Sequence, residues 1–237
     1  MSDYHSIKNR RSETDYIMPL WLPFLPYIIG FVGGIIIIAL FIFIPVSYSK
    51  SVISSTPFYS ELLFSSLLLV YIPIEAISAA ILGYIMYRLI KRFNDHATRI
   101  KALFGSVNQD GKENQVISEI DYLPRRDPAK WAIIIGILLI IPFLSIVSLI
   151  LIFYIFHSLN KDFVKIERAE NNGFIQIGWK GDRYFKIVDR STALYIVLSI
   201  ITLGIFMLYW IYTVANDPNE HFREDWRIED SITPSSP

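Results

Sequence analysis

The sequence predicts an all-α membrane protein with four transmembrane helices. Of its 237 residues, 53% are hydrophobic and 19% are charged, whereas soluble domains carry about 25% charged residues. The charges are also unevenly spread, because four apolar segments alternate with polar ones. Each apolar segment exceeds the ~20 residues needed to cross a hydrocarbon core of ~30 Å. Since a backbone in lipid must satisfy its own hydrogen bonds, each segment is predicted to be helical.

The four predicted spans lie in a membrane domain of residues 19–216, between a cytoplasmic N-terminal tail (1–18) and a polar cytoplasmic C-terminal tail (217–237). Pro73 and Pro142 lie inside the second and third spans and predict kinks there. The third span has an alternative, a re-entrant hairpin bent at Pro142, which would place both flanking loops on one side. The spans are residues 20–46, 62–87, 131–156 and 192–214.

The distribution of Lys and Arg predicts the orientation of the chain. With four spans, the side that carries both termini holds 14 of the 22 Lys and Arg residues, and the other side holds 8. Basic residues favour the cytoplasmic side. We therefore expect a multi-pass protein of the cell membrane with both termini cytoplasmic. The lipid bilayer, other membrane subunits or a second copy of the chain are the expected partners. Balanced acidic and basic residues give no case for nucleic-acid binding.

Two polar segments carry their own patterns. After Tyr87 the chain is predicted to continue as a basic amphipathic cytoplasmic helix, which can lie on an anionic membrane surface or pack on a partner subunit. Between the third and fourth spans, the alternation over residues 174–188 predicts a small extramembrane β-hairpin. The apolar face of the amphipathic helix comprises Leu89, Phe93, Ile100, Leu103 and Phe104.

Aromatic residues mark the points where two helices are expected to leave the bilayer. A polar Asn-Asp pair follows in both cases, which indicates either parallel repeats or chance convergence. In the second case Pro218 follows the pair, and proline disfavours helix in the residue before it, so the last helix is predicted to end at Asn216. The predicted interface anchors are Tyr84, Tyr87, Tyr209, Trp210 and Tyr212.

The stretch SIITLGIFMLYWIYTVANDPNEHF resembles the signature of a family of integral membrane proteins, domain of unknown function 4234. The resemblance lies in T-x-G-I, then Y-W-x-Y, then a polar exit that contains asparagine. It covers about the last fifth of the chain, and it implies a small helical membrane protein with no known activity. The matching residues are Thr202, Gly204, Ile205, Tyr209, Trp210, Tyr212 and Asn216.

Glu75, near the middle of the second span, is the sharpest functional candidate. A carboxylate at bilayer depth is costly and usually faces a bundle interior or a water-filled cavity. With Tyr71 and Ser78 on the same helix face, it forms a candidate intramembrane site for a proton or cation. The alternative is a protonated glutamate that hydrogen-bonds between helices as a structural contact.

Small residues at four-residue spacing predict close helix packing in two places. Gly30 and Gly34 lie in the first span, and Ala79 and Gly83 lie in the second. Small side chains at this spacing let two helix backbones approach closely. The contact can lie inside the chain's own bundle or between subunits.

No catalytic, cofactor or metal site is predicted. His5, His96, His157 and His221 are scattered along the sequence without metal-binding spacing, and the chain has no Cys. No convergent set of titratable residues is visible, so an enzyme is not expected. We expect a non-catalytic subunit or scaffold of a membrane assembly. The alternative is a small transporter or channel that uses Glu75 as its proton or cation site.

Overall fold

The computed structural model describes residues 2–48, 58–107 and 115–232, and every regular element in these ranges is helical. This confirms the predicted all-α class. The elements are α1 (Ser2–Asn9), α2 (Arg11–Thr14), the 3₁₀ turn η1 (Leu22–Phe24), α3 (Leu25–Tyr48), α4 (Phe58–Val107), α5 (Gln115–Asp121), α6 (Pro128–Ile140), the 3₁₀ turn η2 (Pro142–Leu144), α7 (Ser145–Gln176), α8 (Thr192–Ile201) and α9 (Ile205–Ser231).

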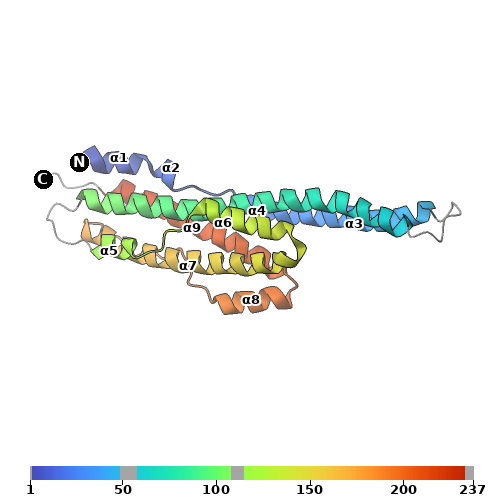
Figure 1. Cartoon of the computed structure of the whole chain (residues 1–237). Helices are drawn as coiled ribbons and strands as arrows, with labels where there is room; N and C mark the ends of the chain where they lie inside the picture. The colour runs from blue at the N-terminus through green and yellow to red at the C-terminus, as the bar shows by residue number, and fades with distance from the viewer. Residues whose placement is uncertain (1, 49–57, 108–114, 233–237) are drawn as a thin grey trace.

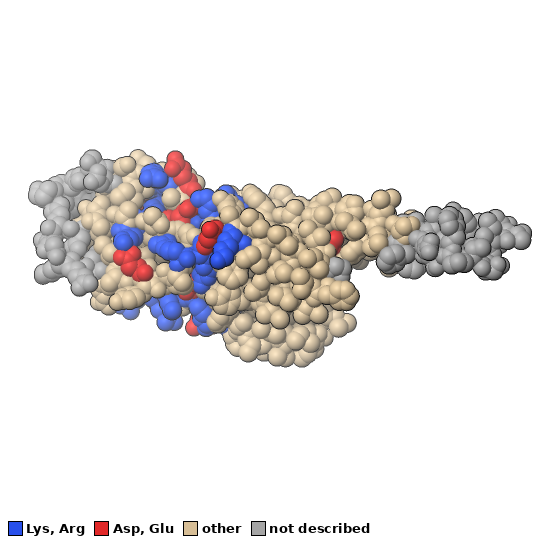
Figure 2. Space-filling view, viewed as in Figure 1, with Lys and Arg blue, Asp and Glu red and all other residues tan. Residues whose placement is uncertain are grey.

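The molecule has an apolar half and a polar half along the axis of α4. In Figure 1 α4 runs the length of the molecule, α3 lies antiparallel to its first part, and the remaining helices gather along its later part. Figure 2 shows that Lys, Arg, Asp and Glu cluster over the half that contains the end of α4. Three helices, α3, α4 and α7, are long and apolar enough to cross a membrane, while α6 and α8 are shorter apolar helices.

The third apolar segment is not one helix. α6 ends at Ile140, the chain reverses through Ile141 and η2, and α7 returns antiparallel (Figure 1). Ile141 is extended (ψ 111°), as expected for a residue that precedes proline. The prediction of one continuous helix over 131–156 is therefore wrong, and the chain bends at Pro142 as a helical hairpin, as in the alternative interpretation of this segment.

The fourth apolar segment is also a hairpin. α8 ends at Ile201, α9 begins at Ile205, and the turn between them has positive φ at Leu203 (50°) and Gly204 (90°). Glycine adopts this left-handed conformation without a Cβ clash. The prediction of one helix over 192–214 is therefore wrong as well.

α9 does not end where the Asn-Asp-Pro motif predicted. It passes through Pro218 and continues to Ser231, so residues 217–231 are not a polar tail. Proline removes the N–H that the carbonyl of Val214 would accept, but Nη2 of Arg92 donates to that carbonyl at 2.6 Å. Nη1 of Arg92 also donates to the carbonyl of Ala215 at 3.2 Å. A buried side chain from α4 thus replaces the missing backbone donor.

α4 continues as a helix past Tyr87 to Val107, as predicted. Its predicted apolar face, however, is buried inside the chain's own bundle, and its basic residues Arg92 and Arg99 are buried too. This helix therefore does not lie flat on a membrane surface, and its apolar face needs no partner subunit to cover it.

The predicted β-hairpin at residues 174–188 is also wrong. α7 continues to Gln176, and the chain that follows is irregular up to α8. Side chains of α7 form hydrogen bonds with the backbone of this irregular segment, as a neighbouring strand would in a hairpin. The amide of Asn171 donates to the carbonyl of Tyr184 at 2.7 Å and accepts from its N–H at 3.0 Å. Glu167 accepts from the N–H groups of Lys186 and Ile187.

Candidate metal centre

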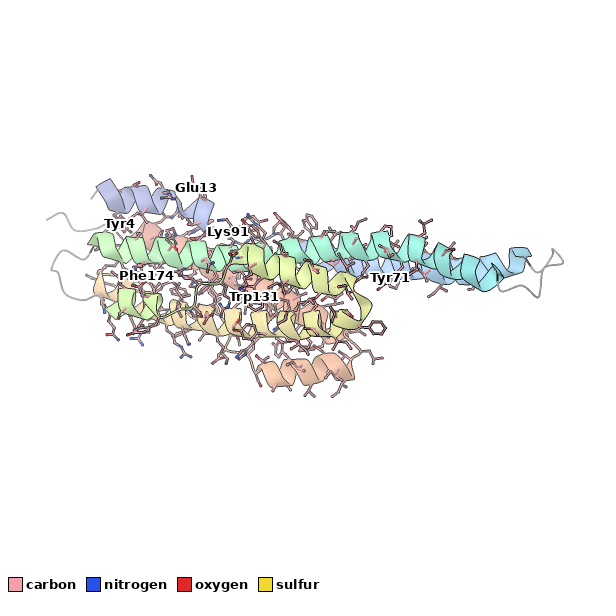
Figure 3. All side chains as sticks on the ribbon, in the orientation of Figure 1. Tyr4, Glu13, Tyr71, Lys91, Trp131 and Phe174 are labelled. Atoms are coloured by element: carbon pink, nitrogen blue, oxygen red, sulfur yellow. The ribbon has the colours of Figure 1, made fainter. Side chains whose placement is uncertain are left out.

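The predicted intramembrane polar site is not assembled by hydrogen bonds. Tyr71 lies on the part of α4 that packs beside α3 (Figure 3), and both it and Glu75 are half-buried. The hydroxyl of Ser78 is buried and has no hydrogen-bond partner among the described residues. These three residues share a helix face, but within the described chain no hydrogen bond joins them.

The small residues divide into two groups. Ala79 is buried, and a Cβ on Gly83 would lie 3.2 Å from the carbonyl oxygen of Ala132 on α6. α4 and α6 are therefore in close contact there. A Cβ on Gly30 or Gly34 would meet no described atom within 4 Å, so these two glycines do not pack inside the described bundle.

The predicted interface anchors differ in exposure. Tyr84 and Tyr209 are about half exposed, and Tyr87 and Tyr212 are partly exposed. Trp210 is 2% exposed and stacks on Phe153, with ring centroids 5.2 Å apart, so it is a core residue rather than an interface anchor.

A buried cluster of charged side chains occupies the polar half. It brings together His96 of α4, Glu170 of α7, and His221 and Asp225 of α9, all with fully buried side chains. One ligand atom from each lies within 4.8 Å of all the others. His96 and His221, which are scattered in the sequence without metal-binding spacing, thus meet in the fold. We call these four residues the ligand set.

Both histidines present Nε2 to the same two carboxylates. Nε2 of His96 lies 2.8 Å from Oε1 of Glu170 and 3.6 Å from Oδ2 of Asp225. Nε2 of His221 lies 2.9 Å from Oε2 of Glu170 and 3.4 Å from the same Oδ2 of Asp225. The two nitrogens and three oxygens thus face a common point.

These five atoms form no hydrogen bond of acceptable geometry within the described chain, although they are buried. In two of the four residues, the polar atom that points away from this common point does have a hydrogen-bond partner. Nδ1 of His96 pairs with Asp15 at 3.0 Å, and the hydroxyl of Tyr184 donates to Oδ1 of Asp225. The two Nε2 atoms and the Glu170 oxygens lie at ion-pair distance, and Oδ2 of Asp225 lies 3.4 and 3.6 Å from the two nitrogens. Because a buried polar group without a hydrogen bond costs about 1–3 kcal/mol, a single cation that contacts all five atoms would stabilise this arrangement.

A second layer of carboxylates backs the histidines. Asp15 pairs with Nδ1 of His96 and accepts from Arg99 and from Nε1 of Trp226 (2.8 Å). Oε1 of Glu167 lies 3.4 Å from Nδ1 of His221. The hydrogen bond to Asp15 fixes the orientation of His96, an arrangement typical of metal-bound histidines, whereas Nδ1 of His221 lies near Glu167 without a hydrogen bond of acceptable geometry.

The cluster carries excess negative charge. Five buried carboxyl groups face one guanidinium, that of Arg99, and two imidazoles, so when all five are ionised the negative charge exceeds the positive charge even if both imidazoles are protonated. Burial and the adjacent Glu170 carboxylate raise the pKa of Asp225 to about 8. Burial alone lowers the pKa of His221, but the Asp225 and Glu170 carboxylates raise it well above its usual value. The site therefore favours added positive charge. The carboxylates are Asp15, Glu167, Glu170, Asp225 and Glu229.

Helical spacing places these groups. His221 and Asp225 are one turn apart on α9, and Glu167 and Glu170 are one turn apart on α7, so each pair shares a helix face. The missed signal lies in α9, where charged residues occupy the same buried face as Phe222. Charged side chains on an otherwise apolar face are rare unless they are paired or bind a metal.

One family comparison bears on this segment. A family model described as Domain of unknown function (DUF4234) matches residues 190–232. The match confirms the predicted resemblance at the C-terminal end. The DUF4234 segment includes α8, α9 and two of the ligand set, His221 and Asp225. No curated protein and no solved structure matches the chain.

Proposed function

We propose that this chain is a membrane protein that binds one divalent first-row transition metal ion through His96, Glu170, His221 and Asp225. The observation that carries the proposal is the convergence of five buried donor atoms that lack hydrogen bonds. A divalent ion at that point supplies the positive charge that the five carboxylates lack, and it satisfies all five atoms together.

The distances between donor atoms support a single ion. For metal–ligand bonds of about 2.1 Å, neighbouring donors lie about 3.0 Å apart at right angles and about 3.4 Å apart at tetrahedral angles. The four separations from the histidine nitrogens to the carboxylate oxygens run from 2.8 to 3.6 Å. These four separations fit neighbouring donors around one ion, and small shifts of the side chains would bring all donors within about 4.2 Å, the distance that two such bonds can span.

The donor types limit the ion. Ca²⁺ and Mg²⁺ take oxygen ligands, whereas imidazole suits Zn²⁺, Fe²⁺ and their neighbours in the first row. Soft ions such as Cu⁺ prefer thiolates, and the chain contains no Cys. Two imidazoles with two carboxylates therefore favour Zn²⁺, Fe²⁺ or Mn²⁺.

The proposed role of the ion is structural. A ligand set with fully buried side chains resembles the closed sites that hold a fold together, while catalytic sites keep an open position. The ion would fasten α4, α7 and α9 to one another. This role agrees with the expected non-catalytic subunit or scaffold of a membrane assembly.

The transporter alternative has less support. Glu75 lies 21 residues before His96 on the same helix, a separation of about 31 Å, so it takes no part in the ligand set. It is half-buried and has no hydrogen bond to its expected partners in the described chain.

The proposal also retains both termini on the cytoplasmic side. The ends of the described chain pack together, since Nζ of Lys8 donates to the carbonyl of Glu229 at 3.0 Å and Arg11 pairs with Asp230 at 2.9 Å. Tyr4, beside this contact, lies near one end of the molecule, and Tyr71 lies farther along α4 in the apolar half (Figure 3). This contact supports a common side of the membrane for both ends of the described chain.

Metal analysis tests the metal proposal. The full chain is purified in mild detergent, and its metal content is measured by mass spectrometry. We expect about one Zn²⁺, Fe²⁺ or Mn²⁺ per chain, retained in His5→Ala and lost in His221→Ala. His5 is an exposed histidine outside the cluster, which makes it a matched control. A chain that stays free of metal after incubation with each of the three ions would refute the proposal.

A second measurement separates metal loss from misfolding. Co²⁺ is titrated into the metal-free wild type and the conservative variant Asp225→Asn. We expect saturation at one equivalent with a visible absorption band in the wild type, and a weaker, shifted band in the variant. Identical spectra would remove Asp225 from the ligand set.

The scaffold part has its own test. Proteins that co-elute from the native membrane in mild detergent are identified by mass spectrometry. A stoichiometric membrane partner is the expected result. Elution as a lone monomer or a homo-oligomer would contradict the subunit role.

A further inference from the structure

We infer that the α6–α7 and α8–α9 hairpins enter the bilayer from the cytoplasmic side and turn within it, while α3 and α4 cross it. The lipid acyl chains are thus the partner of the exposed hairpin tips. This inference goes beyond metal binding and rests on different residues.

The helix lengths fit half-membrane hairpins. α6 has 13 residues and α8 has 10, so they extend about 20 Å and about 15 Å. Neither crosses a hydrocarbon core of about 30 Å. α3 has 24 residues, about 36 Å, and is long enough to cross.

The tips of the hairpins present large apolar side chains to the surroundings. Phe143 is 91% exposed at one tip, and Leu203 is 93% exposed at the other. Such side chains at adjacent tips are costly in water but favourable in lipid. Their neighbours Ile146, Ile200, Ile201 and Ile205 are also exposed.

The backbone at one tip is satisfied internally, as lipid requires. In the α8–α9 turn, the N–H of Gly204 donates to the carbonyl of Ser199 at 2.7 Å. The N–H of Phe206 donates to the hydroxyl of Thr202 at 2.9 Å, and this hydroxyl donates to the carbonyl of Leu198 at 2.7 Å.

The other tip is closed in the same way. The N–H groups of Leu144 and Ser145 both donate to the carbonyl of Ile141, at 2.9 and 3.1 Å. A turn that supplies its own hydrogen-bond partners can lie at membrane depth without water.

This topology places almost all Lys and Arg residues on one side of the membrane. With two re-entrant hairpins, the segments at 88–130 and 157–191 share a side with both termini, and that side holds 21 of the 22 Lys and Arg residues. The remaining one is Lys50, in the segment between α3 and α4. The four-span arrangement gives 14 and 8. Because basic residues favour the cytoplasmic side, the hairpin topology satisfies the charge bias far better.

Cysteine accessibility tests the topology, and the natural absence of Cys removes background labelling. Single variants Lys50→Cys, Tyr122→Cys, Lys180→Cys and Phe143→Cys are treated with a membrane-impermeant maleimide in intact cells, permeabilised cells and detergent. Tyr122 and Lys180 are exposed residues of the polar half, on either side of the α6–α7 hairpin.

We expect Lys50→Cys to be labelled in intact cells, and Tyr122→Cys and Lys180→Cys only after permeabilisation. Phe143→Cys should react only in detergent. Labelling of Lys180→Cys in intact cells would show a full crossing between α6 and α8 and overturn the inference. Labelling of Phe143→Cys without detergent would place that tip in water and also overturn it. Protection of Phe143→Cys from a lipid-soluble maleimide as well would show that a protein covers the tip instead of lipid.

Discussion

Replacing Asp15 by Asn tests the carboxylate layer behind the histidines. The Asp15 side chain is fully buried and comes from the segment between α2 and η1, far from the ligand set in sequence. Its Oδ1 faces Nδ1 of His96 at 3.0 Å and Nε of Arg99 at 3.2 Å. Its Oδ2 accepts from Nη2 of Arg99 at 2.7 Å and from Nε1 of Trp226 at 2.8 Å. The substitution keeps the shape and removes the charge.

The geometry sets the size of the effect. An asparagine amide has one oxygen, so whichever position its NH₂ takes, two donors lose their acceptor. If the NH₂ faces His96, the imidazole loses the group that orients it toward the metal. Loss of such an outer carboxylate typically weakens metal binding 10- to 100-fold, or about 1.4 to 2.7 kcal/mol. We therefore expect the Kd for Zn²⁺ to rise within that range.

The assay is a Zn²⁺ competition titration against a chromophoric chelator, with the protein in detergent micelles. Glu13→Gln is the matched control, because Glu13 is an exposed carboxylate two residues away whose ion-pair partner, Arg10, is also exposed. Its Kd should match the wild type. The Co²⁺ spectrum of Asp15→Asn should also shift, which a remote loss of stability would not cause. A helical Asp15→Asn protein with the wild-type Kd and spectrum would refute the positioning role.

Two further substitutions test the packing that holds the site. Arg92→Met should lower the free energy of unfolding by about 1–3 kcal/mol, because the carbonyls of Val214 and Ala215 lose their donor. Adding Pro218→Ala should recover part of the loss, because alanine restores a backbone N–H for the carbonyl of Val214. No recovery would contradict this account. Gly173→Ala should cost about 1–3 kcal/mol, since its Cβ would lie 2.5 Å from the buried Phe104 ring, whereas the control Gly105→Ala meets only ordinary contact. Detergent-denaturation midpoints measure both pairs, and equal midpoints for the two alanine variants would count against the clash.

Hydropathy predicted where the apolar helices lie, but it could not predict where the chain reverses. Residues 131–156 are long enough for one crossing, and composition alone favours that simpler arrangement. Pro142 was a correct indication of a bend. The second reversal has no proline, and Gly204 inside an apolar run predicts a turn only weakly. This reversal depends on the packing of α8 against α9, which cannot be predicted from the local sequence pattern.

The candidate site was missed for a similar reason. His96 and His221 are 125 positions apart, and they meet because α4, α7 and α9 pack together. The helical continuation of α4 was predicted correctly, but it was interpreted as a basic amphipathic helix that lies on an anionic membrane surface or packs on a partner subunit. The i,i+4 pair of His221 and Asp225 on the same face as Phe222 was the local sign of a buried polar site. The break predicted at Pro218 hid that periodicity.

The two proposals meet in α9, which links a hairpin tip directly to the ligand set. His221 lies 16 residues after Ile205 at the tip, which is about 24 Å along a continuous helix. α8, which leads to the same tip, is only about 15 Å long. The ligand set therefore lies about 9 Å beyond the level at which α8 begins, where Arg190 pairs with Asp217. A tip buried in lipid thus places the ion just outside the hydrocarbon, on the side that carries the basic residues. The segment matched by DUF4234 contains the tip, the Arg190–Asp217 ion pair and two ligands, so under both proposals it would set the depth of insertion and the height of the site together.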